Sequence, residues 1–470
     1  NICPRSSKKS RNFNVKVYSK KIPEYLVGIW IARILLYSDE AILSSSTSDV
    51  STMTKVNLLY GSSKIPLEIP DRNLLGILDA KPVEGVSNPD KTVLEAILNP
   101  IASKQLSDIA QPNQTAAIVV DDHTRGLPCH ILINPMIDQL RKVGVKERDI
   151  TIIFGTGTHR ATTLEEQQQL LCDVSCRDHR VEVHNCDAED LVHVGKTSFG
   201  TEVEINRIFY EADLHLLTGD IGYHYYSGFG GGRKSVLPAV AGRRSINANH
   251  GMLTHPKAFS GNLEGNPIHL DMVEAAKLAR TDFIVNFVRN TQKEIVSAFA
   301  GDLEQAFYEG VKLVDELGRV KIKEKADIVI TSSGYPKDIN LYQGTKAMVH
   351  ALGAVREGGV LIALLECREG IGHKVFEEWA HKYRSYDELS HQVQTNFIMG
   401  GHKIFYMAQG AKQVHQYLIS ELDVDEVKEY YYVTPFKSAE KALKAAFDQV
   451  GRDATVYVMP HGPDILPTIA

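Results

Sequence analysis

A stretch rich in glycine, histidine and lysine, residues 222–250, is the part of this chain best suited to chemistry. It reads Gly-Tyr-His-Tyr-Tyr-Ser-Gly-Phe-Gly-Gly-Gly-Arg-Lys-Ser from residue 222 to residue 235, and Asn249 and His250 follow. Glycine has no Cβ and readily adopts positive φ, so a large ligand can approach the backbone N–H groups of such a loop. Lys234 offers an amine for a phosphate or a covalent link, and His224 and His250 can bind a soft metal or transfer protons.

This glycine-rich loop has competing interpretations. The string Gly-Gly-Arg-Lys-Ser approaches the phosphate-binding P-loop, which needs glycine directly before the lysine and a helix directly after it. Arg233 occupies that glycine position, and Pro238 would interrupt a helix that began at the lysine. These departures disfavour a nucleoside triphosphate site. A small-molecule kinase or phosphate-binding protein that uses the loop and Lys234 stays as the alternative, and so does an ordinary surface turn.

Bulk composition narrows the class of protein. A chain of 470 residues predicts two or three domains, and 43% hydrophobic with 23% charged residues is an ordinary globular composition. The net charge of −6 argues against a nucleic-acid surface, which needs a basic field. Six cysteines are few for this length and fit a reducing compartment, and no apolar run is long enough to span a membrane. We therefore expect a cytoplasmic protein that acts on a small molecule.

The chain divides into three parts. Met53 opens a strand-like run after a Ser/Thr-rich stretch, so we interpret residues 1–52 as an extension outside the fold. A charged segment near residues 315–325 precedes a new strand, which predicts an N-terminal domain over 53–318 and a C-terminal domain over 319–470.

From residue 115 onward, short β-branched runs alternate with polar loops and helical segments. This alternation indicates an α/β fold, here two α/β domains with mainly parallel sheets. The predicted strands cover residues 116–120, 150–154, 214–218, 283–288, 328–331, 360–365 and 455–459.

Polar side chains follow four of these strands. In open α/β sheets, ligands bind beyond the carboxyl ends of the strands, so we expect the four loops to lie along one edge. The loops carry, in chain order, Asp122 and Arg125; His159; His224; and Lys337, Tyr342, Gln343 and Lys346.

Two imidazoles at adjacent strand ends suggest acid/base chemistry on both sides of one centre. Histidine transfers protons near neutral pH, and racemisation is the simplest task that uses one base for each enantiomer. Arg125, Lys337 and Lys346 could hold a carboxylate or phosphate, and Asp122 could orient an arginine or a histidine.

Five ordered motifs give the chain a resemblance to the lactate racemase family, the nickel-pincer-nucleotide 2-hydroxyacid racemases and epimerases, over about residues 55–450. The family's Asp-x-Thr-Arg is similar to residues 122–125, and its Gly-Thr-His-Arg to residues 157–160. The remaining motifs are the histidine, glycine-rich loop and lysine of residues 224–234, the Asn-His pair of residues 249–250, and the Tyr-Gln-x-x-Lys of residues 342–346.

The resemblance implies roles for single residues. Lys234 would tether the cofactor, a pyridinium-3-thioamide-5-thiocarboxylic acid mononucleotide carrying Ni(II), and His250 would be the protein ligand to nickel. His159 and His224 would be the paired acid/base residues of a hydride-transfer mechanism through a 2-keto acid. The remaining cofactor-binding positions would be Asp122, Arg125, Gly230, Gly231, Gly232, Tyr342, Gln343 and Lys346, and the active site would lie in the interdomain cleft.

One departure from the family pattern concerns the substrate. The family often continues Asp-x-Thr-Arg with Pro-Thr-Pro, whereas Gly126-Leu127-Pro128 follows here. The expected substrate is therefore a small 2-hydroxy acid that need not be lactate. Expected partners are the cofactor-synthesis proteins, with a possible homodimer and no nucleic acid or membrane. A non-catalytic relative that binds or stores the cofactor is a further alternative.

Overall fold

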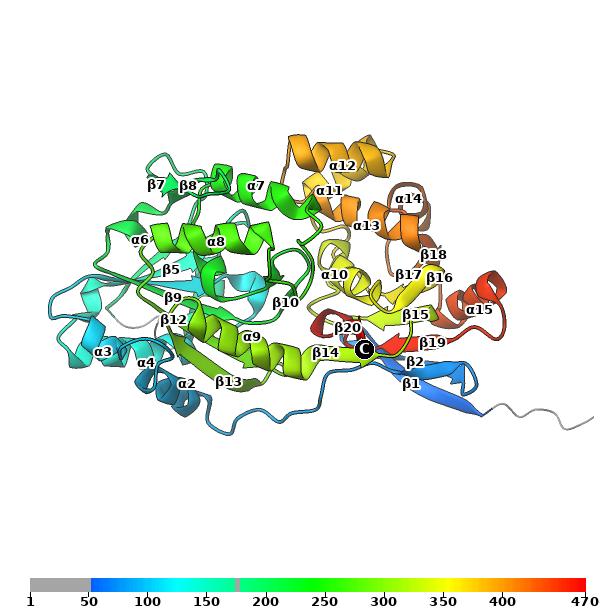
Figure 1. Ribbon diagram of the computed structural model, residues 1–470, viewed down its shortest axis with the longest axis horizontal. Coiled ribbons are helices and arrows are strands. Elements are labelled where there is room, and N and C mark those ends of the chain that lie inside the picture. The colour runs from blue at the N-terminus through cyan, green and yellow to red at the C-terminus, as the bar shows by residue number, and fades with distance from the viewer. Residues whose placement is uncertain (1–51, 173, 175–177) are drawn as a thin grey trace, which may run out of the picture. The chain divides into compact units, whose positions relative to one another are not determined.

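Continuous apolar runs form the strands of two six-stranded sheets. The computed structural model describes residues 52–172, 174 and 178–470, so the predicted extension, apart from its last residue, lies outside the described residues. The strand orders are β13-β12-β9-β4-β5-β6 in the first sheet and β18-β17-β16-β15-β19-β3 in the second. Figure 1 shows the elements with their labels.

The first sheet is parallel except at one edge. Its parallel strands are β4 (Ala116–Asp121), β5 (Ile150–Gly155), β6 (Arg180–Val183), β9 (Leu214–Asp220) and β12 (Phe283–Arg289), and β13 (Ile295–Gly301) pairs antiparallel with β12. The first five residues of β4 are all buried, which is typical of a strand covered on both faces.

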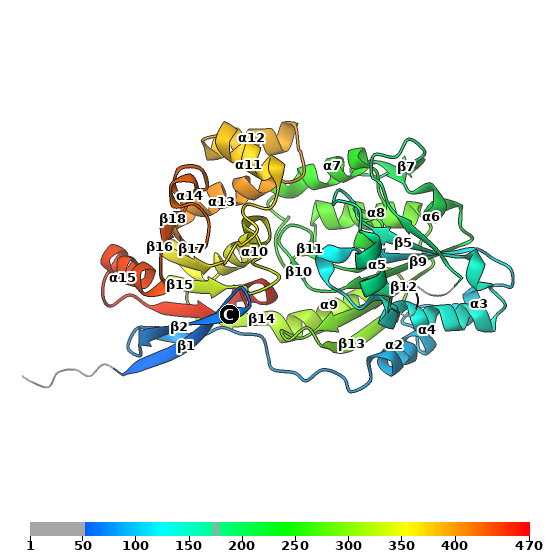
Figure 2. The ribbon, with the colours of Figure 1, turned by 180° about the vertical axis from the view of Figure 1, so that it is seen from behind.

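Helices cover both faces of this sheet. One face packs on α2 (Pro89–Leu98), α3 (Leu106–Ile109) and α4 (Cys129–Lys142), and the other on α8 (Pro267–Leu278) and α9 (Gln305–Gly318) (Figures 1 and 2). The shorter helices are α5 (Leu164–Leu171), α6 (Arg207–Glu211) and α7 (Arg243–Gly251). Two small hairpins are β7 (Val192–Lys196) with β8 (Glu202–Ile205) and β10 (Tyr223–His224) with β11 (Gly228–Phe229).

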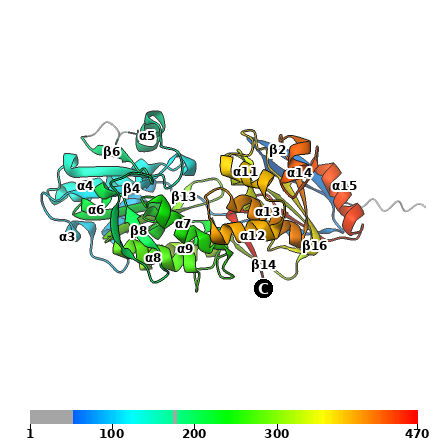
Figure 3. The ribbon, with the colours of Figure 1, turned by 90° about the horizontal axis from the view of Figure 1, so that it is seen from above.

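The second sheet is parallel throughout. Its strands are β3 (Leu74–Ile77), β15 (Ala326–Ser332), β16 (Val355–Leu364), β17 (His415–Ile419), β18 (Thr434–Phe436) and β19 (Val456–Met459). The hairpin of β1 (Met53–Tyr60) and β2 (Ser63–Pro70) packs with α15 (Ala439–Val450) on one face. The other helices are α10 (Leu341–Ala351), α11 (Lys374–Lys382), α12 (Tyr386–Thr395), α13 (His402–Gln413) and α14 (Val424–Tyr430), which Figure 3 shows from above.

The α/β class with mainly parallel sheets is confirmed, and each of the seven predicted strands corresponds to a strand of the structure. One expectation was wrong. Only three of the four polar loops follow strands of one sheet, because β15 belongs to the second sheet. The predicted domain boundary at 318/319 stays a prediction. Residues 53–77 were assigned to the N-terminal domain, whereas β3 pairs with β19 of the second sheet. On the other side of the predicted boundary, β14 (Arg319–Ile322) pairs with β20 (Leu466–Ile469).

Among the described residues, no helix has the length and apolar character needed to cross a membrane.

Candidate active site

Asp122 and His159 form a hydrogen-bonded pair at adjacent strand ends. Because β4 and β5 are parallel neighbours, the loops that follow them meet at the same sheet edge. The Asp122 carboxylate caps the turn after β4 by accepting from the Thr124 N–H at 3.0 Å and the Thr124 hydroxyl at 2.6 Å. Its second oxygen, Oδ2, accepts from His159 Nδ1 at 2.6 Å. Burial opposes ionisation of Asp122, but the hydrogen bond and charge of His159, the charge of Arg125 and the bond from Thr124 together outweigh it and hold the pKa of the carboxyl below its usual range.

The glycine-rich loop is held in shape by side chains packed around it. Gly231 and Gly232 have φ of 74° and 55°, and Asn286 Oδ1 accepts from the Gly232 N–H at 2.9 Å. Arg233, only 1% exposed, donates to the carbonyls of Ser227 at 2.8 Å and Gly231 at 3.2 Å, with its guanidinium over the Phe307 ring. Arg233, the residue that departs from the P-loop pattern, therefore stabilises the conformation of the loop by hydrogen bonds to the loop's own carbonyls.

Lys234, His224 and His250 gather around the ring of Tyr226. Lys234 Nζ lies 3.3 Å from His224 Nε2 and 5.7 Å from the centroid of the Tyr226 ring. The ring centroids of His224 and His250 are 4.4 Å and 5.1 Å from that of Tyr226. His250 lies on α7. The neighbouring Asn249 anchors α7 to α8, because its Nδ2 donates to Asp271 Oδ2 at 2.8 Å.

The electrostatics of this group favour neutral side chains. Burial and the nearby charges of Arg125, Arg233 and Lys346 bring the pKa of Lys234 well below its usual range. Burial, followed by the charge of Lys234, does the same to the pKa values of His224 and His250. A lowered pKa increases the neutral fraction of the amine, which is its nucleophilic form, and a neutral imidazole can accept a proton or bind a metal.

The second sheet contributes residues from α10. Lys346 Nζ donates to Gln343 Oε1 at 2.8 Å, and the Tyr342 ring stacks on His373 with centroids 5.0 Å apart. Burial and the charges of Arg125 and Lys337 lower the pKa of Lys346 to about 7. Lys337 itself is paired with Asp464, so it is a weaker candidate for binding an anion than the sequence suggested.

Comparisons with known proteins agree on one family. The profile of the lactate racemase N-terminal domain matches residues 60–261, and that of the lactate racemase C-terminal domain matches residues 321–466. The lactate racemase of Thermoanaerobacterium thermosaccharolyticum is 35% identical over 427 residues, which cover 88% of this chain and 99% of the relative. The chain belongs to the lactate racemase family. It is therefore an isomerase of the racemase type.

Further relatives support this family assignment. The lactate racemase of Lactiplantibacillus plantarum is 32% identical over 426 residues, covering 88% of this chain and all of the relative. The solved lactate racemase apoprotein of T. thermosaccharolyticum superposes with a TM-score of 0.83 at 33% identity, covering 88% of this chain and 100% of that one. A Thermotoga maritima protein of known structure shares the fold, with a TM-score of 0.63 at 17% identity over 83% of this chain and 100% of that one.

The residues around Tyr226 fit the cofactor that the racemase family implies. Among the described residues, no three His, Cys, Asp or Glu side chains converge as a metal site, so a nickel ion held here would need ligands from the cofactor. His250 can supply one nitrogen, since among the described residues no side chain is hydrogen-bonded to its buried imidazole. The hydrogen-bond partners of Lys234 in the described part of the chain are His224 and Ser227, neither of them a carboxylate, which leaves its amine available for a covalent link.

Several residues near this candidate site were not anticipated from the sequence. His402 and Lys403 at the start of α13 are fully buried, and Tyr225 contacts both of them. The available signal was a cationic pair that opens a helix whose first seven residues are otherwise apolar, Ile404–Ala408. Asp271, which holds Asn249, gave no signal because its partners are distant in sequence.

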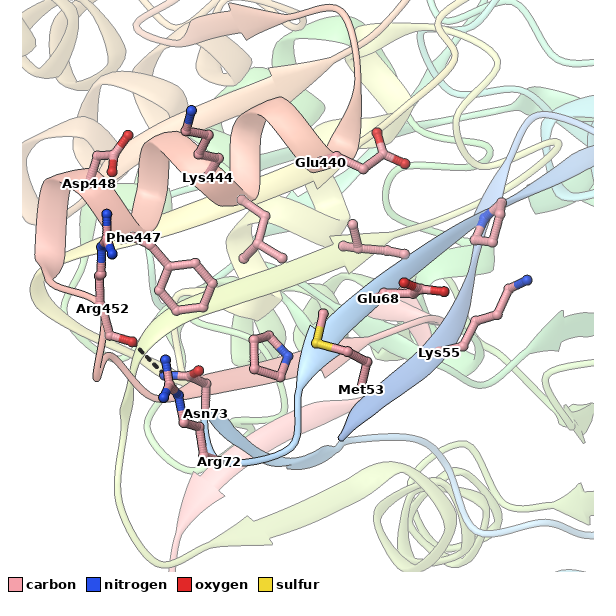
Figure 4. A pocket seen from close by; sticks show the side chains of 14 residues that line it. Met53, Lys55, Glu68, Arg72, Asn73, Glu440, Lys444, Phe447, Asp448 and Arg452 are labelled. Carbon is pink, nitrogen blue, oxygen red and sulfur yellow. Dashed lines mark hydrogen bonds between the residues drawn. The ribbon is translucent and has the colours of Figure 1, made fainter. Parts of the chain in front are cut away.

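A separate hollow of about 650 Å³ lies between the β1–β2 hairpin and α15 (Figure 4). Its lining mixes apolar side chains such as Met53 and Phe447 with charges of both signs, and Asn73 Nδ2 donates to the Arg452 carbonyl across one end at 2.9 Å. None of the predicted racemase site residues lines it, so we assign it no part in the reaction.

Proposed function

We propose that the chain is a racemase or C2-epimerase of small 2-hydroxy acids, lactate being the substrate named for its relatives. The observation that carries the proposal is the convergence of Lys234, His224 and His250 on the Tyr226 ring. An amine, an imidazole for the metal and an imidazole for proton transfer are the groups that this chemistry requires, and they come from two segments of the chain.

Lys234 and His250 would hold the nickel-pincer nucleotide, the lysine by a covalent link and the histidine through a ring nitrogen. When bound, that group supplies a site that accepts the substrate α-hydrogen as hydride and returns it to either face of the planar 2-keto acid. The chain's own residues then handle the hydroxyl proton. In its neutral form, His224 accepts that proton from one enantiomer, and His159 serves the other.

The two histidines are supported differently. His159 Nδ1 is hydrogen-bonded to the Asp122 carboxylate, which fixes the orientation of the ring. His224 has no carboxylate partner among the described residues; burial and the nearby cations favour its neutral form. We propose that one ring acts as acid while the other acts as base, and that the roles exchange with each inversion.

Arg125 and Lys346 would bind the substrate carboxylate or the nucleotide phosphate. Burial disfavours the charge on Arg125, but the carboxylates of Asp121, Asp122 and Asp220 outweigh it and raise its pKa, so the guanidinium stays charged. Tyr342 and Gln343 adjoin Lys346 on α10 and would border the same ligand. Because α10 follows β15 of the second sheet, we propose that the site lies between the two sheets.

The glycine-rich loop favours a tether over a phosphate cradle. The N–H groups of Gly230, Gly232 and Lys234 donate to Gly222 O, Asn286 Oδ1 and Gly231 O, so they are already engaged within the protein. A P-loop binds phosphate through such N–H groups, and their engagement argues against the kinase alternative. A backbone contact from this loop to the nucleotide phosphate stays a prediction.

The test is to co-express the chain with cofactor-synthesis proteins and measure two independent properties. Mass spectrometry of tryptic peptides should show an adduct on Lys234, and chiral chromatography should show interconversion of single-enantiomer 2-hydroxy acids. Lys234→Arg should lose both, whereas Lys444→Arg, in the exposed hollow of Figure 4, should lose neither. Full activity in protein without adduct or nickel would overturn the cofactor assignment, and adduct without any racemisation would favour a cofactor-storage protein.

A further inference from the structure

His224 is oriented by aromatic rings, whereas His159 is oriented by a carboxylate. The hydrogen bonds of His224 among the described residues run to the Ser227 N–H, at 3.4 Å from Nδ1, and to Lys234 Nζ, at 3.3 Å from Nε2. Both are long, and Lys234 is the residue proposed to carry the cofactor. Another element must therefore fix the plane of the His224 ring.

The neighbouring tyrosines supply that element. The Tyr225 ring stacks on the His224 imidazole, with centroids 4.9 Å apart and planes inclined by 23°. The Tyr226 ring meets the same imidazole edge-on, at 4.4 Å and 85°. Contacts at these separations are favourable aromatic arrangements. Together they restrict the orientation of the His224 imidazole, since one ring lies against its face and the other meets it edge-on.

Tyr225 is itself held by α13 of the second sheet. Its hydroxyl donates to His402 Nε2 at 2.6 Å, and the two rings are nearly parallel at 12°. Lys403 Nζ lies 4.2 Å from the Tyr225 ring centroid and donates to Thr345 Oγ1 on α10 at 3.0 Å. Tyr225, His402 and Lys403 are 5%, 0% and 1% exposed, so water does not compete for these contacts.

We propose that Tyr225 is a positioning residue for His224, and that His402 and Lys403 set its position from the opposite side of the site. This inference rests on the proposed function, because it assigns His224 to proton transfer. As a consequence, His224 has the correct orientation only when α13 is in contact with the loop that carries Tyr225. A shift of α13 would displace the Tyr225 ring and, with it, the imidazole plane.

A hydroxyl deletion and a ring deletion separate this role from simple packing. Tyr225→Phe keeps the stack on His224 and removes the bond to His402, so kcat should fall about 5-fold, as expected for one buried hydrogen bond. Tyr225→Leu removes the stack, and kcat should fall about 10- to 100-fold with KM changed less than about 3-fold, because a small misplacement of a reacting group has that cost. Tyr431→Phe is the matched control, since the buried Tyr431 hydroxyl has no hydrogen-bond partner among the described residues.

A double-mutant cycle tests the link to α13. His402→Phe keeps an aromatic ring and removes the acceptor, so it should reproduce the effect of Tyr225→Phe. The double variant should be no slower than either single variant, because both changes remove the same hydrogen bond. Additive losses would overturn the proposed path from α13 to His224.

A readout without cofactor keeps the proposal testable if the leucine variant is unstable or if the proposed function fails. In protein labelled with ¹⁵N-histidine, the ring signals of His224, assigned with His224→Gln, should shift in Tyr225→Phe and stay unchanged in Tyr431→Phe. Unmoved signals together with unchanged kcat would overturn the positioning role. A wild-type holoprotein that racemises no 2-hydroxy acid would instead overturn the proposed function, while the ring signals would still report whether Tyr225 sets His224.

Discussion

Replacing Asp122 by asparagine should slow catalysis without disturbing the turn that Asp122 caps. Asparagine is an equally good capping residue, and its Oδ1 can still accept from the N–H and hydroxyl of Thr124. The substitution alters the second side-chain atom, Oδ2, which becomes an amide nitrogen. Carboxylate Oδ2 accepts from His159 Nδ1, whereas the amide nitrogen can only donate, so the His159 ring must turn its lone pair toward residue 122. The neutral ring then carries its proton on Nε2 and cannot act as a base there.

The expected magnitude follows from the 2.6 Å bond between Asp122 and His159. A hydrogen bond to a charged group contributes about 1.5–3 kcal/mol, and each 1.4 kcal/mol is about tenfold in rate. The His159 side chain is 35% exposed, so water replaces part of the loss and the lower half of that range applies. The wrong tautomer is the result of the same lost bond, so it extends the expected loss only to about 100-fold, the lower end of what general-base catalysis contributes. We expect kcat to fall about 10- to 100-fold with KM within about 3-fold.

The assay is chiral chromatography of lactate incubated with holoprotein, normalised to the Lys234 adduct measured by mass spectrometry. Asp282→Asn is the matched control, because Asp282 Oδ2 contacts the buried His215 Nδ1 at 3.1 Å near the start of β9, away from the polar loops. The control should retain wild-type kcat. If Asp122→Asn keeps more than about a third of kcat, Asp122 does not orient a catalytic base. Equal losses in both variants would indicate a general effect on the fold.

Three further predictions concern binding and stability. The pKa of Lys346 is about 7, so its positive charge is lost between pH 6 and 8, and KM should rise about tenfold over that range in the wild type. The rise should be smaller in Lys346→Arg, where the remaining slope comes from Asp121, whose pKa burial raises to about 7. Steady-state kinetics against pH would measure both slopes. Asp271→Ala leaves the donors of Thr197, Thr201 and Asn249 without an acceptor and should lower the melting temperature by at least about 5 °C in a thermal-shift assay, whereas an unchanged value would contradict the role assigned to this network. Gly231→Ala places a Cβ 2.9 Å from Asn286 Oδ1 at φ 74° and should abolish the Lys234 adduct, whereas Gly200→Ala, also at positive φ but in open space, should cost only about 1 kcal/mol and keep it.

Seven of the twelve strands in the two large sheets were predicted, because each of the seven is a short apolar run bounded by polar residues. The run of residues 116–120 is apolar at every position, which is typical of a strand buried on both faces. Helix ends depend on signals outside the apolar pattern, as at α10, which begins at Leu341. Asn340 sets that end by accepting from the Gln343 N–H, a capping signal that the apolar periodicity does not contain.

The sequence by itself determined the α/β class, the family and the residue types that the reaction needs, because these follow from local patterns and from motifs whose own residues lie within a few positions of one another. Only the tertiary structure decided that β3 joins the second sheet, that Asp122 holds His159, and that Tyr225 links His224 to His402. These contacts join residues 37 to 382 positions apart, as in the Asp122–His159 pair and the Val456–Leu74 pair of β19 and β3. No local preference encodes such pairings, because they form only when the packing of both sheets brings the side chains together.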